Sequence, residues 1–190
     1  MRIPLTLGRT ATATAVAVAA LSLAPALLGA QPAVTPKVYL YFAPTVDAKM
    51  QQYGQAERAR LRSAIVAAVS REAARGAIPA GLSIIVRVQD VAPTRPTVKQ
   101  QMDNPTVDPV RTKFLGGAAL SGVLRDASER VVAQVSYRYF PMVLSQGSVS
   151  LDPWADARLA IDQFALKLAA ACRDAAACRD LSRSGDTRAG

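Results

Sequence analysis

Three aspartates near the middle of the chain have types and spacing that could support chemistry. Asp90, Asp103 and Asp108 lie close together in the sequence, beside and within a segment at residues 92–112 that contains four prolines. Paired carboxylates can act as general acid and base, and clustered carboxylates can bind Ca²⁺. Acidic side chains between prolines are also typical of a solvated loop with no chemical role, which would also explain the three aspartates. A hydrolase that uses carboxylates of the 92–112 loop is therefore kept as an alternative.

The absence of histidine narrows the chemistry further. Histidine is the usual general base at neutral pH and the usual ligand of zinc, copper and iron, and it completes Ser-His and Cys-His nucleophile systems. Gly116, Gly117 and Gly122 resemble a phosphate-binding loop, but no Gly-Lys-Ser/Thr follows them and the segment predicts a strand. We therefore predict a protein that is not an enzyme, with no catalytic residues, no bound metal and no cofactor.

Cys172 and Cys178 are the only cysteines. In a straight helix, residues six apart are separated by about 9 Å along the axis and lie on different faces, which is too far for a disulfide. An intramolecular disulfide therefore requires the helix to end near Cys172 and the chain to turn back. Otherwise the thiols stay unpaired or pair between molecules. We predict the intramolecular bond, with an intermolecular one as the alternative.

The first thirty residues have the pattern of a secretory signal peptide. A short basic start precedes an alanine-rich apolar run at residues 11–28, and small residues end at Ala30. Such leaders are removed on export, whereas a retained membrane anchor would be the alternative. Gln31 stands where a lipid-modified cysteine would follow, which favours a soluble mature form. We predict cleavage near Ala30, a periplasmic or secreted location, and no transmembrane segment after cleavage.

The mature chain is basic. The full chain has 23 lysines and arginines against 14 acidic residues, and two of the arginines lie in the leader, which leaves a formal charge of +7. Outside the cytoplasm the anionic partners are lipopolysaccharide, phospholipid head groups, cell-wall polymers or acidic proteins, and not nucleic acid. No dense cluster of basic residues appears, so a basic surface that keeps the protein soluble explains the charge as well. Binding of anionic envelope polymers is a second alternative.

Hydrophobic periodicity predicts one domain at residues 31–178, followed by a disordered tail at residues 179–190. The predicted elements are a strand at 36–42, a helix at 55–75, a strand at 81–91, a loop at 92–112, a hairpin at 114–139 and a helix that begins at Asp152 as its N-cap. Residues 45–54 receive no assignment. A strand, a helix and a second strand in this order imply a parallel pair. The fold class is α/β: a two-layer sandwich with a four-stranded mixed sheet in the order β-α-β-loop-β-β-α and helices on one face.

The hairpin is the strongest of these patterns. Small and apolar residues alternate with polar ones in both arms, so one face of each arm is apolar. With a loop at residues 126–129, Leu124 lies opposite Val131 and Leu120 lies opposite Val135. A slip by one residue would mix the faces, which restricts the register to even steps. The tyrosines of the second arm are expected to cover the glycines of the first.

The outward sheet face is the candidate partner surface. It combines aromatic rings with guanidinium groups, and its residues are Tyr39, Tyr41, Ile85, Arg87, Gln134 and Arg138. The alternative is the solvated side of a two-layer sandwich.

The hairpin also carries a resemblance to known proteins. The matching residues are Gly116, Gly117, the small residues up to Leu124, the turn of Asp126, Ala127 and Ser128, and the strand of Val131, Val132 and Ala133. They resemble the layout of uncharacterised exported α/β domains of proteobacterial envelopes, which is similar to that of the α/β domain of the curli-secretion assembly protein. The resemblance extends over residues 36–172. It implies the fold and an envelope location and brings no catalytic residues. We therefore expect a non-enzymatic binding or assembly module whose partner is an envelope protein or a second copy.

Overall fold

The computed structural model describes residues 36–143 and 150–186. The predicted leader at residues 1–30 and its cleavage near Ala30 lie outside the described residues.

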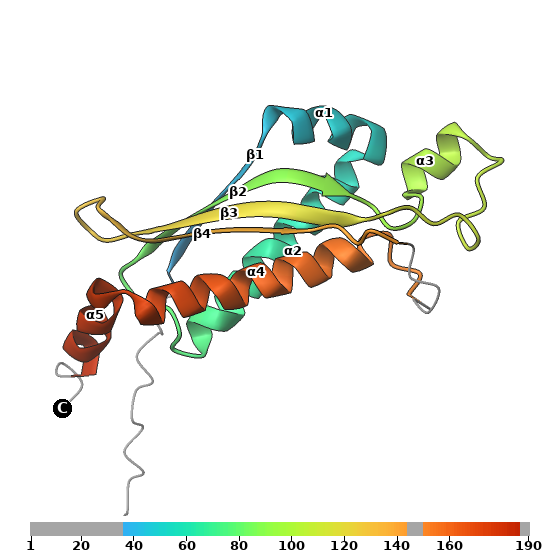
Figure 1. The fold of residues 1–190 in the computed structure, drawn as a ribbon. Helices are drawn as coiled ribbons and strands as arrows, with labels where there is room; N and C mark the ends of the chain where they lie inside the picture. The colour runs from blue at the N-terminus through green and yellow to red at the C-terminus, as the bar shows by residue number, and fades with distance from the viewer. Residues whose placement is uncertain (1–35, 144–149, 187–190) are drawn as a thin grey trace, which may run out of the picture. The chain divides into compact units, whose positions relative to one another are not determined.

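A four-stranded mixed sheet organises the described chain (Figure 1). The elements are β1 (Lys37–Phe42), α1 (Pro44–Tyr53), α2 (Gln55–Ala74), β2 (Ser83–Ala92), α3 (Val98–Asp103), β3 (Gly117–Arg125), β4 (Val131–Tyr139), α4 (Ala155–Asp174) and α5 (Ala176–Asp186). The strand order is β1-β2-β3-β4, with β1 parallel to β2 and the other neighbours antiparallel. The predicted fold class is confirmed, and α2 and α4 cover one face of the sheet.

The segment without a predicted element forms α1. Proline at the first helical position favours this start, and Gly54, with φ 107°, separates α1 from α2. Only Val46 and Met50 of α1 are buried. Two buried residues leave a periodic signal too weak to recognise in the sequence.

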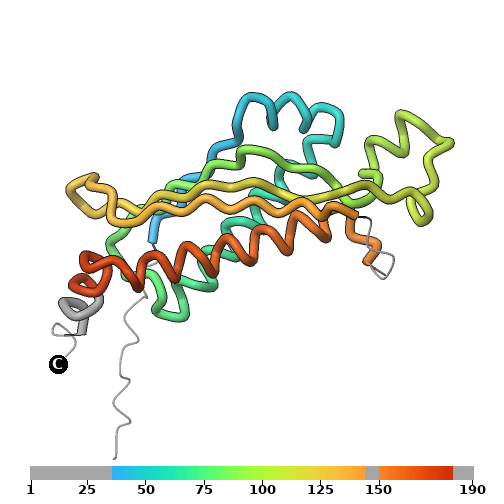
Figure 2. The backbone as a smooth tube through the Cα atoms, viewed as in Figure 1, coloured from blue at the N-terminus to red at the C-terminus, as the bar shows by residue number. Residues whose placement is uncertain are grey.

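The hairpin has the predicted faces but not the predicted register. Leu124 lies opposite Ala133, and Leu120 lies opposite Tyr137, which is a shift of two residues. The two arms run side by side up to a turn at residues 126–130 (Figure 2). The carboxylate of Asp126 accepts hydrogen bonds from the backbone N–H groups of Ser128 and Arg130. The turn is thus one residue longer than predicted, which accounts for one residue of the shift. An irregularity in the strand pairing after Leu124 accounts for the second residue.

The space over Gly122 is filled from α4 and not by the tyrosines of β4. A Cβ at Gly122 would lie 2.7 Å from Cζ of Phe164 and 3.1 Å from Cδ1 of Leu168. Phe164 is fully buried. Glycine therefore lets the helix approach the sheet closely.

Trp154 joins the two helices under the sheet. It is 1% exposed, its Nε1–H donates to Oε2 of Glu57 at 2.7 Å, and its ring lies edge-on to Tyr53 with the ring centroids 5.6 Å apart. The carboxylate of Glu57 also forms an ion pair with Arg60. The buried carboxylate is thereby paired and hydrogen-bonded, as burial of a charge requires.

The C-terminal region differs from the predicted elements in two places. The N-cap of α4 is Trp154 and not Asp152, whose Oδ1 instead accepts a hydrogen bond from the backbone N–H of Trp154. The predicted disordered tail contains helix α5 up to Asp186, while residues 187–190 lie outside the described part. The sequence of this helix is largely polar, and a disulfide ties the helix to α4.

Candidate functional site

The outward residues of the sheet form cross-strand rows, because strand pairing aligns side chains on one face. Tyr39, Ile85, Val123 and Gln134 make one row, and Tyr41, Arg87, Ser121 and Ser136 make the next. A third row contains Asp90, Ala119 and Arg138. We call these three rows the open face. All six residues predicted for the partner surface lie in it.

The aromatic part of the open face is on β1. Tyr39 is 45% exposed and Tyr41 is 55% exposed, and their register partners on β2 are Ile85 and Arg87. Arg87 is exposed, whereas Ile85 is half-buried. Rings with apolar and guanidinium neighbours offer both contact area and hydrogen-bond donors.

The end of the open face near α1 is polar and hollowed. A depression of about 560 Å³ is lined by residues that include Thr45, Lys49, Ser136 and Arg138. Nζ of Lys49 lies 2.6 Å from Oδ1 of Asp90, and the guanidinium of Arg138 lies 4.6 Å from the centroid of the Phe140 ring. Both charges therefore already have contacts within the chain.

Sequence reasoning missed the contributions of Lys49 and Asp90 to this face. An irregularity in pairing between Val88 and Asp90 changes the alternation of β2, so that Asp90 pairs with Ala119. A bulge of this kind re-aims a side chain and has no periodic signature. Lys49 belongs to α1, a segment for which no element was predicted.

The aspartates considered for hydrolysis take part in separate local contacts. Asp90 pairs with Lys49, and Asp103 pairs with Lys99 at 2.8 Å. Asp108 accepts hydrogen bonds from the backbone N–H groups of Arg111 and Val110, which hold the pKa of its carboxyl below the usual value. Within residues 36–143 and 150–186, no three acidic or cysteine side chains form a group that could hold a metal ion.

The loop at residues 92–112 is anchored by a buried arginine that sequence reasoning did not single out. Arg95 is 5% exposed; its Nε donates to the carbonyl of Ser150 at 2.8 Å and its Nη1 donates to the carbonyls of Pro109 and Val110. Main-chain carbonyls thus solvate the guanidinium from two segments. No periodic pattern marks such a residue, because its role depends on loop geometry.

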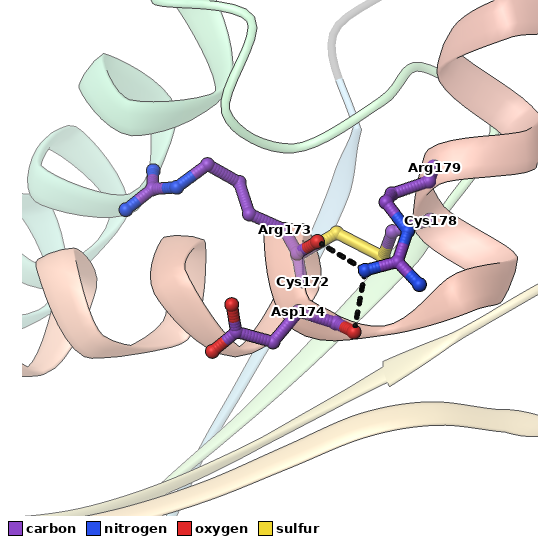
Figure 3. Close-up of a disulfide and its surroundings, with 5 residues drawn as sticks. All are labelled: Cys172, Arg173, Asp174, Cys178 and Arg179. Carbon is purple, nitrogen blue, oxygen red and sulfur yellow. Dashed lines mark hydrogen bonds between the residues drawn. A yellow bond between two sulfur atoms is a disulfide. The ribbon is translucent and has the colours of Figure 1, made fainter.

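The predicted disulfide is present (Figure 3). Helix α4 ends at Asp174, Ala175 is extended, and α5 begins at Ala176, so the Cα atoms of Cys172 and Cys178 lie 5.5 Å apart. Nη1 of Arg179 donates to the carbonyl of Asp174 at 3.0 Å, which satisfies a terminal group of α4. Because stable disulfides are typical of oxidising compartments, the bond indicates an extracytoplasmic location.

Comparison with known proteins assigns no family. No protein-family model and no curated protein matches the chain. A crystal structure described as a minor lipoprotein from Acinetobacter baumannii is similar at 12% identity and a TM-score of 0.25, over 80% of this chain and 95% of that one. This similarity is too low to support an argument. The resemblance to exported proteobacterial domains therefore stays a prediction.

Helices that could cross a membrane are absent from the described part of the chain, since none combines sufficient length with sufficient apolar character.

Proposed function

We propose that the chain is a non-enzymatic binding or assembly module of the cell envelope, periplasmic or secreted, and that its open face binds a partner protein. The observation that carries the proposal is the pair of exposed tyrosines, Tyr39 and Tyr41, beside Arg87 on the sheet face opposite α2 and α4. Tyrosine and arginine are enriched in protein interfaces and among the residues that contribute most binding energy. The disulfide supports the location.

The experiment combines cross-linking with affinity purification of the mature protein from its own cell envelope. The test variant is Tyr39→Ser with Tyr41→Ser, and the matched control is Val98→Ser with Met102→Ser, which removes exposed apolar side chains from α3. Loss of tyrosines that act as binding hot spots should reduce partner recovery at least tenfold, since truncation of a hot-spot residue typically costs about 2 kcal/mol or more. The control should recover the partner as the unchanged protein does.

Two results would contradict the proposal. Recovery of the mature protein alone excludes a stable partner, and equal recovery by the tyrosine variant excludes the open face. A partner lost in moderate salt would instead favour an anionic envelope polymer, because exposed charges are screened by salt.

The hydrolase alternative has its own test. If the mature protein hydrolyses model substrates and Asp103→Asn with Asp108→Asn abolishes that activity, the loop carboxylates are catalytic and the binding proposal is replaced. The local pairing of Asp103 and the low pKa of Asp108 favour a structural role for both side chains.

A further inference from the structure

The two edges of the sheet differ in how well they are protected. β1 has six residues, follows Pro36 and ends before Pro44. β4 has nine residues with no proline or glycine, and Arg138 is its only charged residue. Its outer edge pairs with no other segment in the part of the chain that the structure describes. A long edge strand with little charge is a template for pairing with another strand.

The inward side chains of β4 are also less buried than those of the other strands. On β3 the inward residues Leu120 and Leu124 are fully buried. On β1, at the opposite edge, the inward Leu40 and Phe42 are 7% and 8% exposed. The inward residues of β4 are only half-buried; they are Ala133, Val135, Tyr137 and Tyr139. A further strand beside β4 would cover them.

We propose that β4 pairs antiparallel with β4 of a second copy of this chain, so that two four-stranded sheets form one continuous sheet. Inward residues must face inward residues across such a pair, which places the two-fold axis at a residue and not between residues. The regular part of β4 runs from Ala133 to Tyr139, after the irregularity near Val131, and its centre is Ser136.

This register makes β4 complementary to itself. The cross-strand pairs are Ala133 with Tyr139, Gln134 with Arg138, Val135 with Tyr137, and Ser136 with Ser136. On the inward face each tyrosine meets a smaller apolar side chain, and on the outward face the arginine meets an amide oxygen. Aromatic and β-branched pairs stabilise antiparallel strands, whereas like charges directly opposite destabilise them. No like charges face each other here.

Self-pairing goes beyond the proposed binding function and does not depend on it. The edge contact uses the backbone of β4 and not Tyr39 or Tyr41. It places two open faces next to each other, so a partner with two-fold symmetry could contact both. A protein that recovers its partner but forms no dimer contradicts self-pairing alone. A protein that forms the dimer but recovers no partner contradicts the binding proposal alone.

The first experiment is site-directed cross-linking of the mature protein. Ser136→Cys places two thiols on the proposed axis, where directly paired Cα atoms are about 4.5–5.5 Å apart and a disulfide can form. Mild oxidation should give a covalent dimer on a non-reducing gel. Ser121→Cys is the matched control, because Ser121 is the β3 neighbour of Ser136 on the same face. That variant should stay monomeric on the gel.

The second experiment measures self-association by sedimentation velocity over a range of concentrations. Ser136→Lys puts two like charges on the axis and should weaken the dimer at least about tenfold. Ser136→Thr should retain it, and Ser121→Lys, which adds the same charge one strand away, should retain it as well. Circular dichroism of each variant checks that the monomer folds.

A monomeric wild-type protein at every concentration overturns the proposal. So does a dimer that Ser136→Lys leaves unchanged. If Ser136→Cys cross-links only to another envelope protein, the occupant of the edge is that protein and not a second copy.

Discussion

The two faces of the sheet differ in composition and burial, although residues of the two faces alternate along the same strands. Val86 is fully buried under the helices, and Arg87, the next residue, is exposed. The inward face is made of aliphatic and aromatic residues with a glycine where a helix comes close, and the open face carries tyrosine, arginine and serine among its apolar residues. Substitutions one residue apart should therefore separate stability from recognition. Three predictions test this separation, in order of decreasing effect.

Truncation of the aromatic side chain of α4 that packs on Gly122 should have the greatest effect. Phe164→Ala opens a cavity above Gly122 and should lower the free energy of unfolding by about 3–5 kcal/mol. Leu166→Ala is the control on the same helix, since Leu166 is 44% exposed; it should change stability by roughly 0.5 kcal/mol or less. Urea unfolding measures both. Equal losses in the two variants would contradict the division into faces.

A smaller change tests the close approach of α4 to β3. Gly122→Ala places a methyl group 2.7 Å from the ring of Phe164, and overpacking of this kind costs about 1–3 kcal/mol. The lower entropy of the unfolded alanine chain offsets about 0.4–1 kcal/mol. Ser121→Ala, on the other face, should be nearly neutral. A stabilising effect of Gly122→Ala would show that α4 can move away from the sheet without cost.

The smallest effect concerns Asp126 in the turn that joins β3 and β4. Desolvation raises the pKa of Asp126, but the hydrogen bonds from Arg130 and Ser128 and the charge of Arg130 together lower it below the usual value. A lowered pKa stabilises the folded state above the unfolded pKa of about 4, and this contribution is lost as the pH falls through the folded pKa.

Nuclear magnetic resonance titration of the Asp126 carboxyl carbon measures that pKa. Asp126→Asn should remove this part of the pH dependence of stability and leave partner recovery by the open face unchanged. A pKa at or above the usual value would show that the turn does not hold the carboxylate in its charged form.

Period-two alternation allowed the two faces of the strands to be predicted from sequence, and the six residues predicted for the partner surface do share one face. The hairpin register was off by two residues, because the hydrophobic pattern restricts it only to even steps and the hydrogen bonds of Asp126 shape a longer turn. Asp90 joined the open face through a bulge, and Arg95 became buried through contacts with loop carbonyls. These outcomes depend on backbone geometry that residue types alone do not specify.

The disulfide was predictable for a different reason. Helix geometry left only a few arrangements for cysteines six residues apart, and the observed break at Ala175 is one of them. The helix that follows the break was not predicted, because its composition resembles that of a disordered tail.

The hydrogen bond between Glu57 and Trp154 spans 97 residues of sequence, which bears on when the protein can fold. During synthesis, the first helices leave the ribosome long before Trp154 does. Until then Glu57 has no indole partner and the groove that α4 occupies is empty, so the core cannot close. Contacts between such distant residues slow folding. The core of the nascent chain therefore stays open until α4 has been synthesised.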